Sequence, residues 1–318
     1  MANFFTSLFS KKDKTEEIIN EKNLKKNFDI FKYDGIKALK MGKIKYAVLC
    51  FERALHIRED SEVLNYLALA YKSEDFKEDA ISIYSKLIGM EPDNALNYIN
   101  RAELFLQLKE YEETIADCKN AIALEPETTK SYLMLAQAYR DLNQTEEAVV
   151  HLTNVIEIAP ECINAYLMRS EINFERKEHH NRVSADITKI LKISPENENA
   201  MLLRAKIHKA KDKIKEALID YDRVIEINPF NEQAYAEKGR ALMENGKAQE
   251  AVEFLTEALD TNPESYIIWA MRGEVKENMG DIEGAQTDFA KSREIEEFAD
   301  EYSSTPNNYA SLYKNSPI

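Results

Sequence analysis

Apolar and polar residues alternate with helical spacing along most of the chain, and residues 129–162 show the pattern most clearly. A first helical face is made by residues at i, i+3, i+4 and i+7, namely Tyr132, Leu135, Ala136 and Tyr139. After a polar break, a second apolar face is made by Ala148, Leu152, Val155 and Ile156. Pro160 ends the second helix, because proline lacks an N–H and restricts the residue before it. Two short helices with one apolar face each cannot form a core alone, so the stretch needs neighbours of the same kind.

The same stretch recurs with a nearly fixed period. Six of the eight prolines, separated by 34, 34, 35, 34 and 34 residues, are Pro92, Pro126, Pro160, Pro195, Pro229 and Pro263. A period near 34 indicates an array of helical pairs. Small and large apolar residues alternate before each proline, for example Ala80, Tyr84 and Leu87, and Ala217, Tyr221 and Val224. This pattern resembles the tetratricopeptide repeat (TPR) family, whose motif alternates small and large residues over a helix–turn–helix.

The resemblance implies an all-α fold, a right-handed superhelical solenoid of about eight helix–turn–helix repeats. The expected repeats are 28–60, 61–94, 95–128, 129–162, 163–197, 198–231, 232–265 and 266–299. The fifth repeat has one extra residue, which helix geometry tolerates only in its turn. Residues 1–27 form an N-terminal segment, amphipathic or flexible, and residues 300–318 a flexible tail. Positions below are counted from the first residue of each repeat, omitting the extra residue of the fifth.

Charge and cysteine content limit the classes of partner and compartment. The net charge of −15 argues against binding a nucleic-acid backbone, which requires clustered lysine and arginine. The three cysteines, Cys50, Cys118 and Cys162, have no CxxC spacing. They are interpreted as buried thiols in a reducing, cytoplasmic setting.

The N-terminal segment leaves two alternatives open. Phe4, Phe5, Leu8 and Phe9 fall on one helical face, and Lys11 and Lys12 follow. The apolar part is too short for a signal peptide core or a membrane span. It is either a short interfacial membrane anchor, which would make the protein membrane-peripheral, or a tail that is free or docked on the first repeat.

No motif for catalysis is present in the sequence. There is no glycine-rich phosphate loop, no HExxH and no GxSxG. The adjacent histidines His179 and His180 lack companion ligands at metal spacing. The sequence therefore predicts a protein that is not an enzyme, with no catalytic residues, no cofactor and no metal.

By the resemblance, function lies in a concave groove formed by positions two, five, nine, twelve and thirteen of the first helices. An apolar track at position five with mixed charges around it gives the candidate groove residues Ile99, Asn100, Glu103, Lys130, Leu133, Gln137, Arg140, Leu167, Glu171, Leu202, Lys206 and Arg240. Such a groove suits an extended peptide or a partner's helix. The alternative is that the aliphatic track only supports adjacent helices.

Two TPR subtypes can be compared residue by residue. Chaperone-tail binders carry a carboxylate clamp, of which Asn100 and Lys130 match two positions. Asn65 and Leu69 stand where lysine and asparagine belong, and Met134 replaces the arginine whose forked donors hold a carboxylate. The asparagine ladder at position six, typical of glycosyltransferase-associated arrays, is missing. We therefore expect a scaffold for a protein partner of unknown identity. The alternatives are a membrane-peripheral assembly factor tethered by residues 4–9, and a regulatory subunit of an enzyme complex.

A comparison of repeats within the chain predicts structural ion pairs. Four repeats have arginine at position seven and aspartate at position 23: Arg101 and Asp117, Arg169 and Asp186, Arg204 and Asp220, Arg272 and Asp288. The other four repeats have no arginine at position seven and no aspartate at position 23. The pattern predicts one salt bridge across the two helices of each repeat that has both residues, with the arginine stem packed where leucine stands elsewhere. The alternative is that these arginines bind a ligand.

Overall fold

The chain forms two compact helical units. The computed structural model describes the backbone of residues 2–176 and 180–304, and the side chains of residues 21–176 and 182–298. Over these residues there are sixteen α-helices and no strand. Residues 1–165 form the first unit and residues 166–318 the second. The predicted all-α architecture of about eight helical pairs is confirmed.

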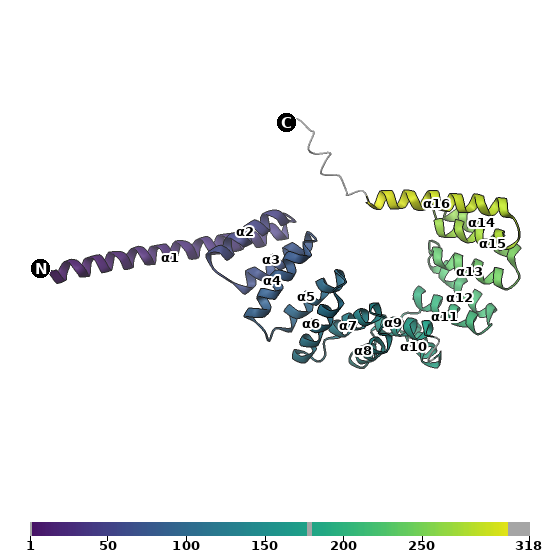
Figure 1. Ribbon diagram of the computed structural model, residues 1–318, viewed down its shortest axis with the longest axis horizontal. Coiled ribbons are helices and arrows are strands. Elements are labelled where there is room, and N and C mark those ends of the chain that lie inside the picture. The colour runs from purple at the N-terminus through teal and green to yellow at the C-terminus, as the bar shows by residue number, and fades with distance from the viewer. Residues whose placement is uncertain (1, 177–179, 305–318) are drawn as a thin grey trace, which may run out of the picture. The chain divides into compact units, whose positions relative to one another are not determined.

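The first unit contains four helical pairs (Figure 1). Its helices are α1 (Ala2–Lys40), α2 (Ile44–Ile57), α3 (Ser61–Ser73), α4 (Lys77–Met90), α5 (Ala95–Gln107), α6 (Tyr111–Leu124), α7 (Thr129–Asp141) and α8 (Thr145–Ile158). Each helix packs on the next, and α5 also packs on α7.

The second unit contains the helices α9 to α16. The helix α9 begins three residues before the boundary between the units. The bounds of these helices are α9 (Ile163–Glu175), α10 (His180–Ile193), α11 (Glu198–Ala210), α12 (Ile214–Ile227), α13 (Glu232–Glu244), α14 (Ala248–Thr261), α15 (Tyr266–Asn278) and α16 (Ile282–Ser304). Four residues separate α9 from α10, whereas three separate α11 from α12. The extra residue of the fifth repeat therefore lies between its two helices. His180 begins α10 rather than lying in that turn, and His179 is outside the described residues.

In seven of the pairs, the turn between the two helices contains a residue with left-handed backbone; residues 177–179, in the turn of the fifth pair, lie outside the described residues. Positive φ angles occur at Gly42, Asp75, Lys109, Asn143, Asp212, Gly246 and Gly280. At Asn143 the following N–H, that of Gln144, donates back to the Tyr139 carbonyl at 2.7 Å. This bond satisfies a carbonyl at the end of the first helix, as in other glycine- or asparagine-terminated helices. The turn therefore recurs at the period of the repeat.

The turn between pairs places a capping residue before most of the first helices. Side-chain oxygens accept the N–H of a residue in the first turn at Asp60, Asn94, Asn197, Asn231 and Ser265. Such caps stabilise a helix start by about 1 kcal/mol. Together with the prolines, they fix where each first helix begins.

Small residues at position eight let the two helices of a repeat approach closely. A Cβ at Gly35 would lie 2.5 Å from Phe51 Cε1, and one at Gly273 would lie 2.8 Å from Phe289 Cε1. Alanine takes this position in the second, third, fourth and sixth repeats, where Ala68, Ala102, Ala136 and Ala205 are fully buried. The small residues in the sequence thus stand where a large side chain of the second helix packs closely against the first helix.

The ends of the helical array differ from the expected boundaries. The helix α1 runs from Ala2 through residue 28 without a break, so the N-terminal segment continues the first helix of the first repeat (Figure 1). The helix α16 ends at Ser304, beyond residue 299. The side chains of residues 4–12, on which the membrane-anchor alternative depends, lie outside the described residues. None of the helices in the described part of the chain is long and apolar enough to cross a lipid bilayer.

Candidate functional site

In the first unit, three successive first helices are joined by a short ladder of charges. Glu103 on α5 accepts a hydrogen bond from Lys130 Nζ on α7 at 3.2 Å and another from Lys72 Nζ on α3. Burial acts to raise the pKa of Glu103, but the hydrogen bonds and charges of the two lysines outweigh it and hold that pKa below its usual value. Lys72 stands at position twelve of its repeat, Glu103 at position nine and Lys130 at position two. Together they define one surface, the α3–α5–α7 face.

Two exposed leucines lie on the same face. Leu69 on α3 is 49% exposed and Leu96 on α5 is 56% exposed. They occupy positions nine and two of successive repeats, the same relation as Glu103 and Lys130, whose charged ends are in contact. The two leucines therefore stand on successive first helices of this face, at the positions that Glu103 and Lys130 occupy one repeat later. Sequence reasoning missed them, although both stand at positions that the family resemblance assigns to the groove.

The predicted apolar track at position five is only partly a surface. Ile99 and Leu202 are 6% and 4% exposed and belong to the cores of their units. Leu133 and Leu167 are half-buried. Ile99 and Leu202 therefore present little surface to a groove, because adjacent helices cover them, and they support those helices.

Several polar residues predicted for the groove are already engaged with other side chains. Gln137 Nε2 donates to Asp141 Oδ1 at 2.8 Å. Arg240 contacts Glu237 and Glu274, each at 3.3 Å. Asn100, Arg140 and Glu171 are half-buried. The polar residues predicted for the groove are thus of two kinds: some bond to neighbouring side chains, and others are partly covered.

The second unit has a hollow of about 410 Å³ on its own first helices. The hollow is lined by Phe174, Lys206, Lys209, Ala210, Glu237, Arg240 and Glu244. Lys209 lies 3.1 Å from Glu244 and 4.0 Å from Glu237. Among the described side chains, Lys206 has no acidic partner within 4.0 Å, so it is the cation of this hollow best placed to meet a carboxylate of a bound protein.

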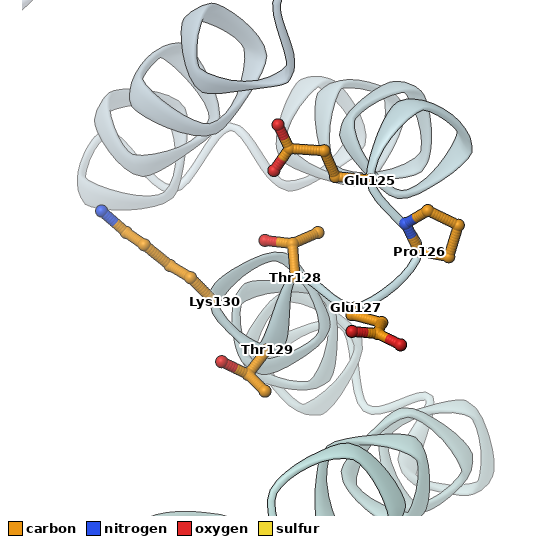
Figure 2. Close-up of a pocket in the computed structure, with 6 residues that line it drawn as sticks. All are labelled: Glu125, Pro126, Glu127, Thr128, Thr129 and Lys130. Carbon is orange, nitrogen blue, oxygen red and sulfur yellow. The ribbon is translucent and has the colours of Figure 1, made fainter.

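A further hollow of about 590 Å³ lies at the turn between α6 and α7. Figure 2 shows the residues that line it, with Lys130 leaving the turn on the side opposite Pro126. Since Lys130 ends at Glu103 on α5, this lysine belongs to the charge ladder as well as to the hollow. The lysine that matches a chaperone clamp is therefore partly neutralised.

All four arginine–aspartate pairs expected from the sequence are present. Each arginine uses Nε and one terminal nitrogen on the two carboxylate oxygens, and the shortest distances are 2.7 Å for Arg101–Asp117, 2.7 Å for Arg169–Asp186, 2.6 Å for Arg204–Asp220 and 2.7 Å for Arg272–Asp288. All four aspartates are buried. Each pair joins the two helices of one repeat.

The arginines also reach a third helix, which the sequence comparison did not anticipate. Arg101 donates to Ser85 Oγ at 2.8 Å, and Arg272 donates to Thr256 Oγ1 at 3.1 Å. Both hydroxyls stand at position 25 of the preceding repeat. The recurrence of serine or threonine there was the available signal, and each of these arginines ties two successive repeats together.

Arg204 differs from the other three arginines. Its side chain is 42% exposed, against 20% for Arg101 and 12% for Arg272. It lines a hollow of about 240 Å³ together with His208, Lys211 and Lys213. The alternative that the arginines bind a ligand is therefore best supported at Arg204. Arg101 and Arg272 are more covered, and each bonds to side chains of two neighbouring helices in this chain.

Comparison with known proteins identifies the repeat. Models of the tetratricopeptide repeat match residues 105–172, 198–231 and 220–253. A tetratricopeptide repeat protein from Parabacteroides merdae superposes with a TM-score of 0.62 at 19% identity, covering 74% of this chain and 93% of that protein. The pilF protein of Pseudomonas aeruginosa gives a TM-score of 0.52 at 16% identity, covering 66% and 95%. At these identities the likeness shows the fold alone.

Two curated relatives match over a short stretch. Hsc70-interacting proteins 1 and 2 of Drosophila melanogaster are each 39% identical to this chain over 62 residues, which is 20% of this chain. The matched stretch spans only 16% of the length of those relatives.

Proposed function

We propose that this chain, which belongs to the tetratricopeptide repeat family, is a non-catalytic scaffold that binds an extended peptide or a partner's helix on the α3–α5–α7 face. The observation that carries the proposal is the pair of half-exposed leucines, Leu69 and Leu96, beside a fixed charge ladder. Exposed apolar side chains rimmed by polar groups are typical of protein-binding surfaces.

The chemistry of the face favours an amphipathic partner. The two leucines offer an apolar contact shared by α3 and α5, and burying them against a partner contributes on the order of 1 kcal/mol each. The ladder beside them carries two lysines and one glutamate, so it can direct a partner's acidic side chain without attracting a strongly anionic one. We therefore propose a partner segment with apolar side chains on one side and mixed polar residues on the other.

An acidic chaperone tail fits this face less well. The Drosophila relatives are named for interaction with Hsc70, but the clamp positions here are incomplete. Lys130 contacts Glu103 at 3.2 Å, and Met134, which stands at the arginine position, is buried. Calorimetry with an acidic C-terminal chaperone peptide is expected to show binding weaker than micromolar. Tighter binding that is abolished by Lys130→Ala would contradict this proposal.

The binding face can be tested without knowing the partner. Peptides selected by display on the intact chain are measured against a face variant, Leu69→Asp with Leu96→Asp. Because each substitution puts a carboxylate at the apolar contact, affinity is expected to fall by about 10-fold or more per site. The matched control is Leu124→Asp with Val150→Asp, which are 40% and 57% exposed on second helices of the same unit.

The outcomes separate the face from the rest of the surface. Peptides that bind the control as tightly as the wild type but lose affinity for the face variant support the proposal. Selected peptides that bind the face variant with unchanged affinity would show that recognition occurs elsewhere. Circular dichroism of all three proteins excludes unfolding as the cause of a loss.

A further inference from the structure

The charge of the chain is divided unequally between residues 1–45, which contain α1 and the turn into α2, and the rest. Residues 1–45 contain 11 lysines, no arginine and 6 acidic residues, a net charge of +5. The whole chain carries −15, so residues 46–318 carry −20. A basic helix on an acidic protein indicates an anionic partner for that helix, which is a surface distinct from the α3–α5–α7 face.

The lysines of α1 are gathered on the side that faces away from its core contacts. The buried residues of α1 are Phe28, Gly35 and Ala38. The opposite side carries residues at successive helical turns, namely Lys22, Lys26, Ile30, Tyr33, Lys37 and Lys40. All six are exposed. None of these four lysines has an acidic partner within 4.0 Å among the described side chains, unlike Lys32, which contacts Asp60 and Glu62.

Large apolar side chains are interleaved with these lysines. Tyr33 is 67% exposed, Met41 is 58% exposed and Tyr46, in the first turn of α2, is 51% exposed. Lys37, Lys43, Met41 and Tyr46 also line a hollow of about 260 Å³ at the turn between α1 and α2. An arrangement of lysines around aromatic and aliphatic groups is typical of helices that lie in the interface of a bilayer.

We propose that the outward side of α1, with the turn into α2, binds the surface of a membrane that contains anionic lipids. In this arrangement the lysines lie at the level of the lipid phosphates, and Tyr33, Met41 and Tyr46 enter the boundary between headgroups and acyl chains. Lys37 and Lys43 line the hollow at the turn together with Asp34 and Ala38, and in this arrangement the two lysines contact lipid phosphates there.

The choice of lysine favours a membrane over an acidic protein as the occupant. Protein interfaces are enriched in arginine and depleted in lysine, because arginine forms fixed bidentate contacts. Here every basic residue among the first 45 is lysine, whereas arginine is used for the buried pairs of the repeats. A diffuse anionic surface needs only point charges, which lysine supplies.

Vesicle co-sedimentation of the full chain tests the proposal. The wild type is expected to bind vesicles of phosphatidylcholine with phosphatidylserine, and not phosphatidylcholine alone. The variant Lys22→Glu, Lys26→Glu, Lys37→Glu, Lys40→Glu is expected to bind on the order of 1000-fold more weakly at low salt, since each lysine contributes about a fivefold gain in affinity for an anionic surface. Raising the salt concentration should weaken wild-type binding, because exposed charges are screened.

Two control variants match the changes in charge and apolar area. Four exposed lysines elsewhere, Lys119, Lys192, Lys211 and Lys215, are replaced by glutamate. Tyr33→Ser with Met41→Ser is expected to lower binding by about 10-fold, whereas Ile219→Ser with Phe230→Ser, at residues of similar exposure, is not. Residues 1–21 are unchanged in every variant, so a loss is assigned to residues 22–41.

Several results would overturn the proposal. One is a wild type that binds neither vesicle, and another is equal binding by the wild type and the α1 lysine variant. Equal losses in the α1 lysine variant and its control would mean that only the net charge matters. If vesicles are not bound but the lysine variant loses self-association in light scattering, the partner of α1 is an acidic surface of a second copy.

Discussion

The third and fourth repeats place different chemistry at the same contact between their two helices. In the third, Arg101 on α5 meets Asp117 on α6 through two hydrogen bonds. In the fourth, the equivalent positions hold Leu135 on α7 and His151 on α8, and the His151 ring stacks on Tyr139 with centroids 5.4 Å apart. The helical pairs are otherwise alike, so this contact accepts either an ion pair or an apolar and aromatic cluster when both sides match.

The difference concerns what happens when only one side changes. A buried ion pair loses hydration that its attraction only roughly offsets, whereas removal of one partner leaves a charge without compensation. An apolar contact has no such penalty, and its loss costs the buried area. The paired repeats should therefore be much more sensitive to single substitutions than to double ones.

The largest effect is expected for Asp288→Ala in the eighth repeat. Asp288 is 1% exposed and accepts hydrogen bonds from Arg272 and contacts Lys276 Nζ at 2.8 Å. Its removal leaves two cations facing each other, which should lower the free energy of unfolding by roughly 3–5 kcal/mol. Urea denaturation measures the change. The matched control, Asp222→Ala, removes a 50% exposed partner of Lys238 and should cost less than about 1 kcal/mol.

The double substitution in the sixth repeat is the next largest test. Asp220→Ala alone should lower the free energy of unfolding by about 1–3 kcal/mol, because the exposed part of Arg204 remains hydrated. Adding Arg204→Leu should recover part of that loss, since Leu67 and Leu135 are accommodated at the same position. A double variant less stable than Asp220→Ala would show that the arginine stabilises the repeat by contacts other than the aspartate.

The repeat architecture could be predicted from the sequence because it depends on spacing. The prolines, the small residues opposite large ones and the paired appearance of arginine and aspartate all follow the period of 34, and internal comparison exposes them. The ion pairs could be predicted without knowledge of a ligand. Four repeats have both the arginine and the aspartate and four have neither, so the two residues occur together or not at all.

The surface could be predicted only in part, because coverage by neighbouring helices is not periodic in one chain. Helical spacing assigns Ile99 and Leu202 to the same side as Leu133, but packing against the helices of their own and the following repeat buries the first two. Conversely, Leu69 and Leu96 remain exposed, and the repeat that follows each of them has a charged side chain at the same position, Glu103 and Lys130. The continuation of α1 through residue 28 is consistent with the sequence, because no proline or glycine precedes Gly35.

The smallest expected effect concerns pH and the fourth repeat. Burial, followed by the charge of Lys119, lowers the pKa of His151 relative to its ordinary value, despite the opposing charge of Glu147. His151 Nδ1 is buried and has no hydrogen-bond partner among the described residues. The neutral ring is therefore the form that fits the folded repeat, whereas in the unfolded chain histidine takes up a proton near pH 6.5.

The sign of the pH dependence follows from this difference. Below about pH 6.5 the unfolded chain binds more protons than the folded chain, so His151 lowers stability progressively until the pH reaches its depressed folded-state pKa. His151→Phe keeps the stacking on Tyr139 and removes the titration, so the loss of stability between about pH 7 and 5 should become shallower. Thermal melts across this range measure it, with His56→Asn at an exposed histidine as the control. Identical pH profiles for the wild type and His151→Phe would mean that the ring is protonated in the folded repeat without a penalty.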